Sequence, residues 1–212
     1  MVEKELRFIK NGEINLESEY FQSYKDIKYP TVLICHPHPE YGGNMYNNVI
    51  SGVYDTLIQN DISCLRFNFR GVGKSTGTHS DGSGELSDVL ACINFLLNDK
   101  NCERIIICGY SYGAAMGCSA INNSNYVIGF ISISFPWDFV DVKYKELSQS
   151  TKPKLFIQGD KDTIAQFENF EFHYNLYHQP KKKKIITGGD HFYRGYEREI
   201  SREVLKFYNS LT

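Results

Sequence analysis

The sequence has little net charge and no long hydrophobic run. Lys and Arg number 23 against 25 Asp and Glu, which gives a net charge of −2 over 212 residues. Such a balance provides no electrostatic basis for binding nucleic acid or an anionic membrane. No apolar run approaches the roughly 20 residues that a membrane-spanning helix needs. We therefore expect a protein that binds neither nucleic acid nor a membrane.

The N-terminus also lacks the apolar stretch that is typical of a signal peptide. No two cysteines form a Cys-x-x-Cys pair, and three of them lie in apolar, strand-like runs. We interpret all six as reduced, mostly buried residues of a cytoplasmic protein. They are Cys35, Cys64, Cys92, Cys102, Cys108 and Cys118.

What the chain does have is a regular alternation of strand and helix patterns. Its length and its 42% hydrophobic content predict a single domain over residues 1–212 with a sizeable core. Asn11-Gly12 between alternating runs predicts an N-terminal hairpin over 6–20. Strands are predicted at 31–35, 62–69, 105–108, 126–134, 154–158 and 182–187, and helices at 49–59, 85–97, 164–177 and 193–211. This pattern predicts an α/β fold, a three-layer α/β/α sandwich whose mostly parallel eight-stranded sheet begins with an antiparallel hairpin.

The pentapeptide Gly109-Tyr110-Ser111-Tyr112-Gly113 stands out because of its position in this pattern. It follows the strand at 105–108 and opens a run of small residues that favours a tightly packed helix. A serine on such a sharp turn has its hydroxyl exposed above the sheet edge. Side chains at the two glycine positions would collide across the turn. A glycine-rich turn that merely contains a serine is the alternative, but the strand before and the helix after favour a nucleophile.

A serine hydroxyl needs a base to take its proton and an acid to hold that base. Ligand groups in open α/β sheets lie on loops beyond the carboxyl ends of the strands. Asp162 follows the strand at 154–158, and His191 follows the last strand. The order Ser111, Asp162, His191 is the one expected for such a sheet.

Other residues compete for these roles. Asp160 and Asp138 are alternatives to Asp162 as the acid, because both also follow strands. For the base, we interpret His79, His173 and His178 as surface or packing residues. The side chains of His36 and His38 are interpreted as structuring their loop. No third residue joins this histidine pair at a recognisable metal-ligand spacing, so no metal is expected.

Five segments together resemble those of small α/β-hydrolases: the Gly-Tyr-Ser-Tyr-Gly pentapeptide, His36-Pro37-His38-Pro39 with Tyr41–Asn44, Arg66–Ser75, Gly159–Asp162 and Gly188–Phe192. The similarity covers nearly the whole chain and is to the short, cap-poor subgroup related to dienelactone hydrolases and carboxylesterases. It implies a serine hydrolase that cleaves carboxylic ester or thioester bonds of small acyl substrates through an acyl-enzyme. It implies no cofactor and leaves a homodimer open.

The resemblance also implies an oxyanion hole made of two backbone N–H groups. One belongs to the residue after the nucleophile, here Tyr112. The other comes from the loop after the strand at 31–35. Proline has no N–H, so Pro37 and Pro39 cannot donate, and His38 is the remaining donor in that loop.

The segment 135–152 is too short for a large cap domain, which predicts an open site with aromatic walls. The candidate wall residues are Tyr41, Tyr110, Trp137 and Phe192. For Trp137 and Tyr41, ordinary packing is an equal alternative.

Two other classes of function stay open. Gly71–Ser75 could form a phosphate-binding loop of a nucleotide-binding protein. Its pattern lacks one glycine, since Asn68 occupies that position, and no helix pattern starts directly after it. A hydrolase fold without activity could also serve as a binding partner, although such proteins usually lose one member of the serine, acid and histidine set.

Overall fold

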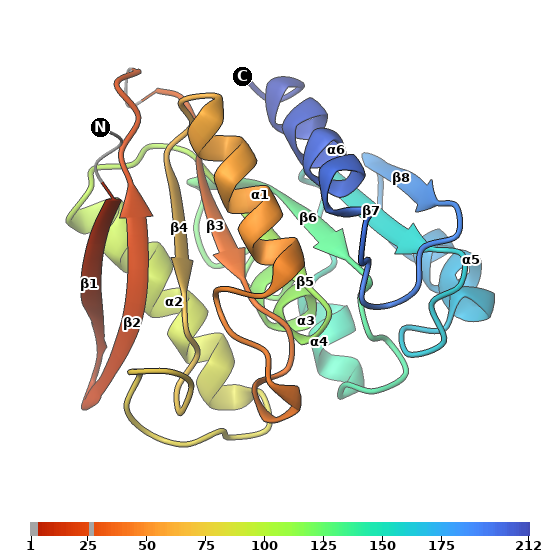
Figure 1. Cartoon of the computed structure of the whole chain (residues 1–212), viewed down its shortest axis with the longest axis horizontal. Coiled ribbons are helices and arrows are strands. Elements are labelled where there is room, and N and C mark those ends of the chain that lie inside the picture. Colours follow the sequence, from red (N-terminus) through yellow and green to blue (C-terminus); the bar gives the residue numbers. More distant parts are fainter. Residues whose placement is uncertain (1–3, 26–27) are drawn as a thin grey trace.

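The computed structural model describes residues 4–25 and 28–212. An eight-stranded sheet in the order β1-β2-β4-β3-β5-β6-β7-β8 runs through its centre (Figure 1). The strands are β1 (Lys4–Asn11), β2 (Ile14–Phe21), β3 (Thr31–Cys35), β4 (Cys64–Phe67), β5 (Ile105–Tyr110), β6 (Val127–Ile133), β7 (Lys154–Gly159) and β8 (Lys181–Ile186). The β1–β2 hairpin is antiparallel, β2 pairs antiparallel with β4, and the other neighbours are parallel. The predicted fold class is confirmed.

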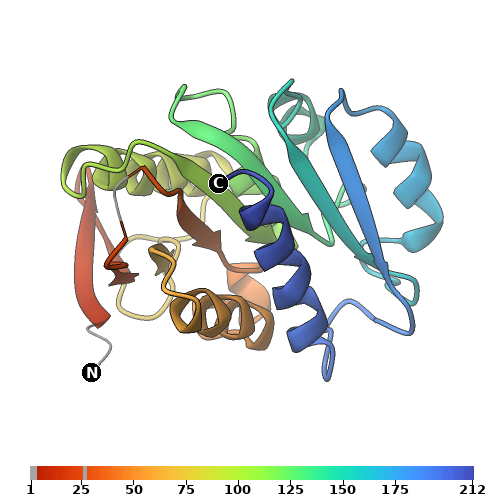
Figure 2. The same ribbon diagram turned by 90° about the horizontal axis from the view of Figure 1, so that it is seen from above.

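Helices cover both faces of this sheet. They are α1 (Asn48–Gln59), α2 (Ser83–Asn98), α3 (Tyr112–Cys118), α4 (Val142–Leu147), α5 (Phe167–Asn175) and α6 (Glu197–Asn209), with a short 3₁₀ turn η1 (Pro39–Tyr41). Helices α1 and α6 lie on one face, and α2 and α5 lie on the other (Figure 2). Successive side chains of a strand point to opposite faces. Accordingly, Ile106 of β5 packs toward α1 and α6, whereas Ile105 and Ile107 pack into the opposite layer.

Two helices begin later than their apolar patterns predict, and in both cases an aspartate explains the delay. The Asp162 carboxylate accepts hydrogen bonds from the N–H groups of residues 164 and 165. The Asp190 carboxylate likewise accepts those of residues 192 and 193. These local bonds hold the chain in turns, because they compete with helical hydrogen bonding. Helices α5 and α6 therefore start at Phe167 and Glu197.

The cysteines and the helix lengths agree with the sequence analysis. All six cysteines are free and buried, as predicted. Within the described residues, no helix is both long enough and apolar enough to cross a membrane. The loops that follow the parallel strands gather at one edge of the sheet, because those strands share one direction.

Candidate active site

Ser111 occupies a strained turn between β5 and α3. Its φ of 54° and ψ of −123° place a non-glycine residue in a sparsely populated backbone region. The turn is so tight that a Cβ on Gly109 would lie 2.3 Å from the Gly113 carbonyl oxygen. A Cβ on Gly113 would lie equally close to the carbonyl oxygen of Cys35. The backbone therefore requires glycine at both positions, as the motif predicts, and it presents the Ser111 hydroxyl to the sheet edge.

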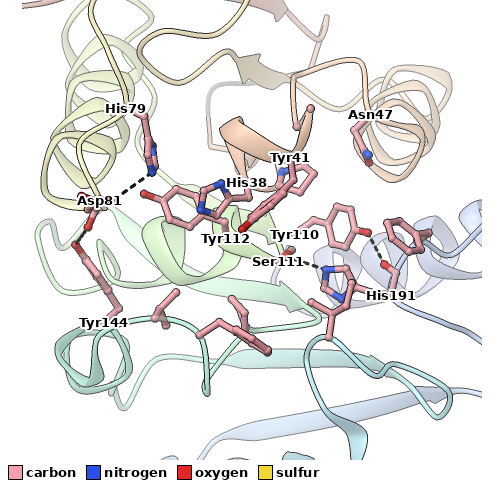
Figure 3. A pocket seen from close by; sticks show the side chains of 18 of the residues that line it. His38, Tyr41, Asn47, His79, Asp81, Tyr110, Ser111, Tyr112, Tyr144 and His191 are labelled. Atoms are coloured by element: carbon pink, nitrogen blue, oxygen red, sulfur yellow. Dashed lines mark hydrogen bonds and ion pairs between the residues drawn. The ribbon is translucent and has the colours of Figure 1, made fainter.

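Three side chains from three different loops form one hydrogen-bonded chain. Ser111 Oγ lies 3.0 Å from His191 Nε2. His191 Nδ1 lies 2.9 Å from Asp162 Oδ2 and 3.0 Å from its Oδ1. The serine and the histidine are each 7% exposed, and the aspartate is 1% exposed. The structure thus joins the three residues that the sequence nominates, with the serine and the imidazole facing the hollow in Figure 3.

The carboxylate of Asp162 is held by a dense set of donors. Ser134 Oγ donates to Oδ2 at 2.7 Å, and Gln158 Nε2 lies 3.2 Å from the same oxygen. Ser134 in turn contacts the hydroxyl of Tyr193 at 2.6 Å. These hydrogen bonds fix the orientation of the carboxylate toward the imidazole. Sequence reasoning missed Ser134 and Tyr193, although Ser134 directly follows β6 at the edge where the other groups gather.

The two rival acids have other partners. Asp160 Oδ1 accepts the N–H of Gly188 at 2.7 Å, which holds the loop that precedes His191. Asp138 lies 3.0 Å from the Asn169 side chain and 3.1 Å from His173 Nε2, over helix α5. Of the three candidate carboxylates, Asp162 is the one that bonds to the His191 imidazole.

Tyr112 and His38, whose backbone N–H groups the resemblance implies as an oxyanion hole, line the same hollow as Ser111. Tyr112 opens helix α3, and the first N–H groups of a helix have no partner within it. On the other loop, the His38 carbonyl accepts hydrogen bonds from the N–H groups of Tyr41 and Gly43. This curls the loop at η1. Among residues 4–25 and 28–212, the backbone hydrogen bonds of turns, loops and caps include none donated by the Tyr112 or the His38 N–H. The oxyanion hole formed by these two N–H groups stays a prediction.

The site opens into a hollow of about 700 Å³. Three of the four predicted aromatic wall residues line it, namely Tyr41, Tyr110 and Phe192. Tyr41 is 88% exposed at the rim. The hydroxyl of Tyr110 donates to the His191 carbonyl, so this side chain also fixes the histidine loop.

Comparison with known sequences then places the chain. Residues 30–204 match the alpha/beta hydrolase domain family. The chain belongs to this family. The uncharacterized protein RP471 of Rickettsia prowazekii is 33% identical over 182 residues, which cover 82% of this chain and 76% of RP471.

Solved structures show the same fold. An alpha-beta serine hydrolase homologue from Coxiella burnetii is 30% identical, with a TM-score of 0.87 and 97% coverage of both chains. The Pyrococcus furiosus esterase Pf2001 has a TM-score of 0.80 at 18% identity, and covers 99% of this chain and 93% of its own. At that identity the second similarity shows the fold alone.

The structure corrects the prediction that Trp137 forms a wall of the site, because this residue does not line the hollow. Its ring is 8% exposed and stacks between Phe135 and His173, with centroid distances of 5.2 and 5.1 Å. Its indole N–H donates to the Tyr177 hydroxyl at 3.2 Å. Its ring also lies 5.8 Å from that of Phe170 on α5. The indole therefore packs in the layer beneath that helix.

Several residues of the hollow were not anticipated. His79 was interpreted as a surface or packing residue, yet it lines the hollow. Further lining comes from the segment between β6 and α4 and from α4 itself, namely Phe139, Val140, Asp141 and Tyr144. No recognisable motif marks these residues. They come close to Ser111 only when the chain folds.

The glycine-rich loop at 71–75 has a different role from phosphate binding. Glu17 Oε2 accepts the Lys74 N–H and the Asn68 side-chain amide, each at 2.8 Å. A buried carboxylate thus occupies the position that a phosphate would need. The next helix, α2, starts only at Ser83. These contacts do not support the nucleotide-binding alternative.

One group of side chains has the composition of a metal site. Ligand atoms of His38, Glu40 and His79 lie within 4.8 Å of one another. The His38 Nδ1, however, accepts the Glu40 N–H at 3.2 Å, which leaves Nε2 as its one free ligand atom. The His38 pKa is lowered by burial and by the neighbouring His79, so its ring favours the neutral form.

Proposed function

We propose that this hydrolase cleaves carboxylic esters or thioesters, with Ser111 as nucleophile, His191 as general base and acid, and Asp162 as the group that orients the imidazole. The observation that carries the proposal is the continuous chain of hydrogen bonds from Asp162 to His191 to Ser111, which ends on a serine held in a strained turn. The membership in the family and the similarity to a serine hydrolase homologue support it.

In the first half of the proposed reaction, Ser111 Oγ attacks the carbonyl carbon and its proton passes to His191 Nε2. Asp162 remains ionised and accepts the Nδ1–H, which fixes the tautomer and stabilises the imidazolium. The carbonyl oxygen becomes an oxyanion that accepts the N–H groups of Tyr112 and His38. Each such donor typically contributes about 10²–10³ in rate.

The tetrahedral intermediate then collapses. The bond to the leaving oxygen or sulfur breaks, and that atom takes the proton from His191 Nε2. The product of this half is an ester between Ser111 and the acyl group. Water follows the same route, giving a proton to Nε2 and an oxygen to the acyl carbon, and Ser111 leaves with its proton restored.

A direct test is the release of 4-nitrophenol from 4-nitrophenyl acetate and of thiol from phenyl thioacetate. We expect turnover of both and a burst of about one 4-nitrophenol per active site, because the acyl-enzyme forms before it hydrolyses. Turnover that persists in Ser111→Ala would contradict the proposal. So would the absence of turnover in folded wild-type protein, which would favour the alternative of an inactive binding protein.

A further inference from the structure

The hollow extends on both sides of Ser111. Figure 3 shows His191 on one side of the serine, and His79, Asp81 and Tyr144 on the opposite side. The two sides differ in chemistry. The side toward His191 includes Tyr110, Phe192 and the neutral amide of Asn47, whereas the opposite side carries the carboxylate of Asp81 beside aromatic rings.

The proposed reaction gives each side a role, so the inference below rests on that proposed function. His191 must reach the leaving oxygen to protonate it, so the leaving group occupies the histidine side. The acyl group points the other way, because the carbonyl carbon lies between its two substituents. We call the far side the acyl arm, lined by His38, His79, Asp81, Tyr112 and Tyr144.

The walls of the acyl arm are flat rings packed together. The His38 centroid lies 4.6 Å from that of Tyr112 and 5.0 Å from that of His79. His79 and Tyr112 are 5.6 Å apart. The Tyr112 hydroxyl donates to Glu85 Oε2 at 3.2 Å, which fixes the ring. Rigid planar walls favour a planar acyl group, since stacking and edge contacts need complementary faces.

The far end of the acyl arm is acidic. The Asp81 side chain is fully exposed at the rim, and its Oδ1 lies 3.7 Å from His79 Nε2. Asp141 also lines the hollow there, with Lys143 3.6 Å from its carboxylate. The carboxylate of Asp81 can therefore accept a hydrogen bond from a bound group, and it repels a negative one.

Glu85 keeps the Asp81 loop in place. Its carboxylate accepts the N–H groups of Ser80 and Gly82, at 3.0 and 2.8 Å, on either side of Asp81. Burial alone would raise the Glu85 pKa, but hydrogen bonds from the backbone N–H groups of Glu85 itself, Ser80 and Gly82, together with the nearby His79, outweigh it and the pKa is lowered. His79 Nδ1 lies 3.0 Å from Glu85 Oε1, without the alignment of a hydrogen bond. Asp81 therefore lies on a loop whose backbone is held by the Glu85 carboxylate.

We propose that the acyl arm selects acyl groups with a flat ring that carries a hydrogen-bond donor at its far end, and that Asp81 discriminates against rings that end in a carboxylate. The ring packs against the exposed side of this aromatic cluster, and the donor reaches the Asp81 carboxylate. This assigns Asp81 a role in specificity, through contact with the substrate and without part in the bond-breaking steps.

Four 4-nitrophenyl esters with one leaving group and one linker test the proposal: those of 3-phenylpropanoate, 3-(4-hydroxyphenyl)propanoate, 3-(4-carboxyphenyl)propanoate and 3-cyclohexylpropanoate. We expect kcat/KM to be about fivefold higher for phenyl than for cyclohexyl, and highest for hydroxyphenyl. The carboxyphenyl ester should be about fivefold slower than phenyl at low salt, and the gap should narrow in 0.5 M NaCl because an exposed charge is screened.

The decisive variant is Asp81→Asn, and the matched control is Asp99→Asn, which removes one exposed carboxylate from the far end of α2. Asp81→Asn should bring the carboxyphenyl and phenyl esters to within twofold, whereas Asp99→Asn should leave the fivefold gap. A gap unchanged by Asp81→Asn, or equal rates on all four esters, would overturn the proposal while Ser111-dependent turnover still stood. Failure to hydrolyse any ester, 4-nitrophenyl acetate included, would overturn the proposed function and this inference with it.

Discussion

Two histidines each follow a parallel strand of the sheet, and they have opposite surroundings. His36 follows β3 and is fully buried. Its Nδ1 lies 2.6 Å from the Pro37 carbonyl oxygen, and its Nε2 accepts the Phe69 N–H at 3.0 Å. Both ring nitrogens therefore serve the backbone, and burial lowers the pKa of His36 to about 4.

His191 follows β8, and both of its ring nitrogens contact side chains, Ser111 on one side and Asp162 on the other. It also borders the hollow, where a substrate can reach it. The difference teaches that residue type and position after a strand do not decide a histidine's role. Its hydrogen-bond partners decide it: backbone partners fix a loop, whereas a serine and a carboxylate permit proton transfer.

The largest loss of kcat should come from removing Ser111, the hydrogen-bond partner of His191. Ser111→Ala should lower kcat by about 10⁴-fold or more on 4-nitrophenyl acetate, because no covalent intermediate can form. Ser119→Ala, at the other end of α3, is the matched control. Its hydroxyl donates to the Ala115 carbonyl, and its loss should change kcat less than threefold. Equal losses in both variants would contradict the role of Ser111.

The next largest effect should separate the two aspartates after β7. Asp162→Asn should lower kcat about 10³- to 10⁴-fold, because an amide no longer stabilises the imidazolium and can hold the wrong tautomer. Asp160→Asn keeps an oxygen that can accept the Gly188 N–H, so kcat should fall less than tenfold. The opposite ranking, measured as initial rates at pH 8, would make Asp160 the partner of the base.

His36 should show its role in the pH dependence of stability. Its pKa is about 4 in the folded protein and near 6.5 when unfolded, so below pH 6.5 the unfolded state binds a proton that the folded state does not. Its contribution to the free energy of unfolding is thus unchanged above pH 6.5. It decreases between pH 6.5 and 4, by up to about 1.4 kcal/mol per pH unit.

His36→Gln should flatten that slope, measured by urea unfolding at several pH values. His178→Gln, at an exposed position, should leave the slope as it is in the wild type. Identical slopes in all three proteins would show that His36 titrates normally and is not held neutral by its burial.

The smallest effect on catalysis should come from Trp137. Trp137→Phe should lower the free energy of unfolding by about 1–2 kcal/mol, since the hydrogen bond to Tyr177 and part of the stacking are lost. Its kcat/KM should stay within twofold of the wild type. Phe192→Leu is the converse control, because this side chain is 54% exposed in the hollow. It should alter KM with little change in stability, and a reversed pattern would return Trp137 to the substrate site.

The sequence was sufficient for features that depend on local pattern and strand order. Ser111 could be placed because glycines at 109 and 113 and the neighbouring strand define its turn, and His191 because it follows the last strand. Side chains that meet only through packing could not be predicted. His79 reaches the hollow from a loop and Tyr144 from helix α4, and no sequence pattern relates these two segments to each other. Trp137 packs with Phe135 and His173 instead, and no sequence pattern relates it to His173.

The central claim is that Ser111 is activated by His191, and labelling with a fluorophosphonate probe tests it most directly. We predict one adduct, located on Ser111 by peptide mass spectrometry, absent in Ser111→Ala and formed at least about 100-fold more slowly in His191→Ala. His178→Ala should label at the wild-type rate. Folded protein that does not label, or that labels equally fast without His191, would contradict this activation of the serine.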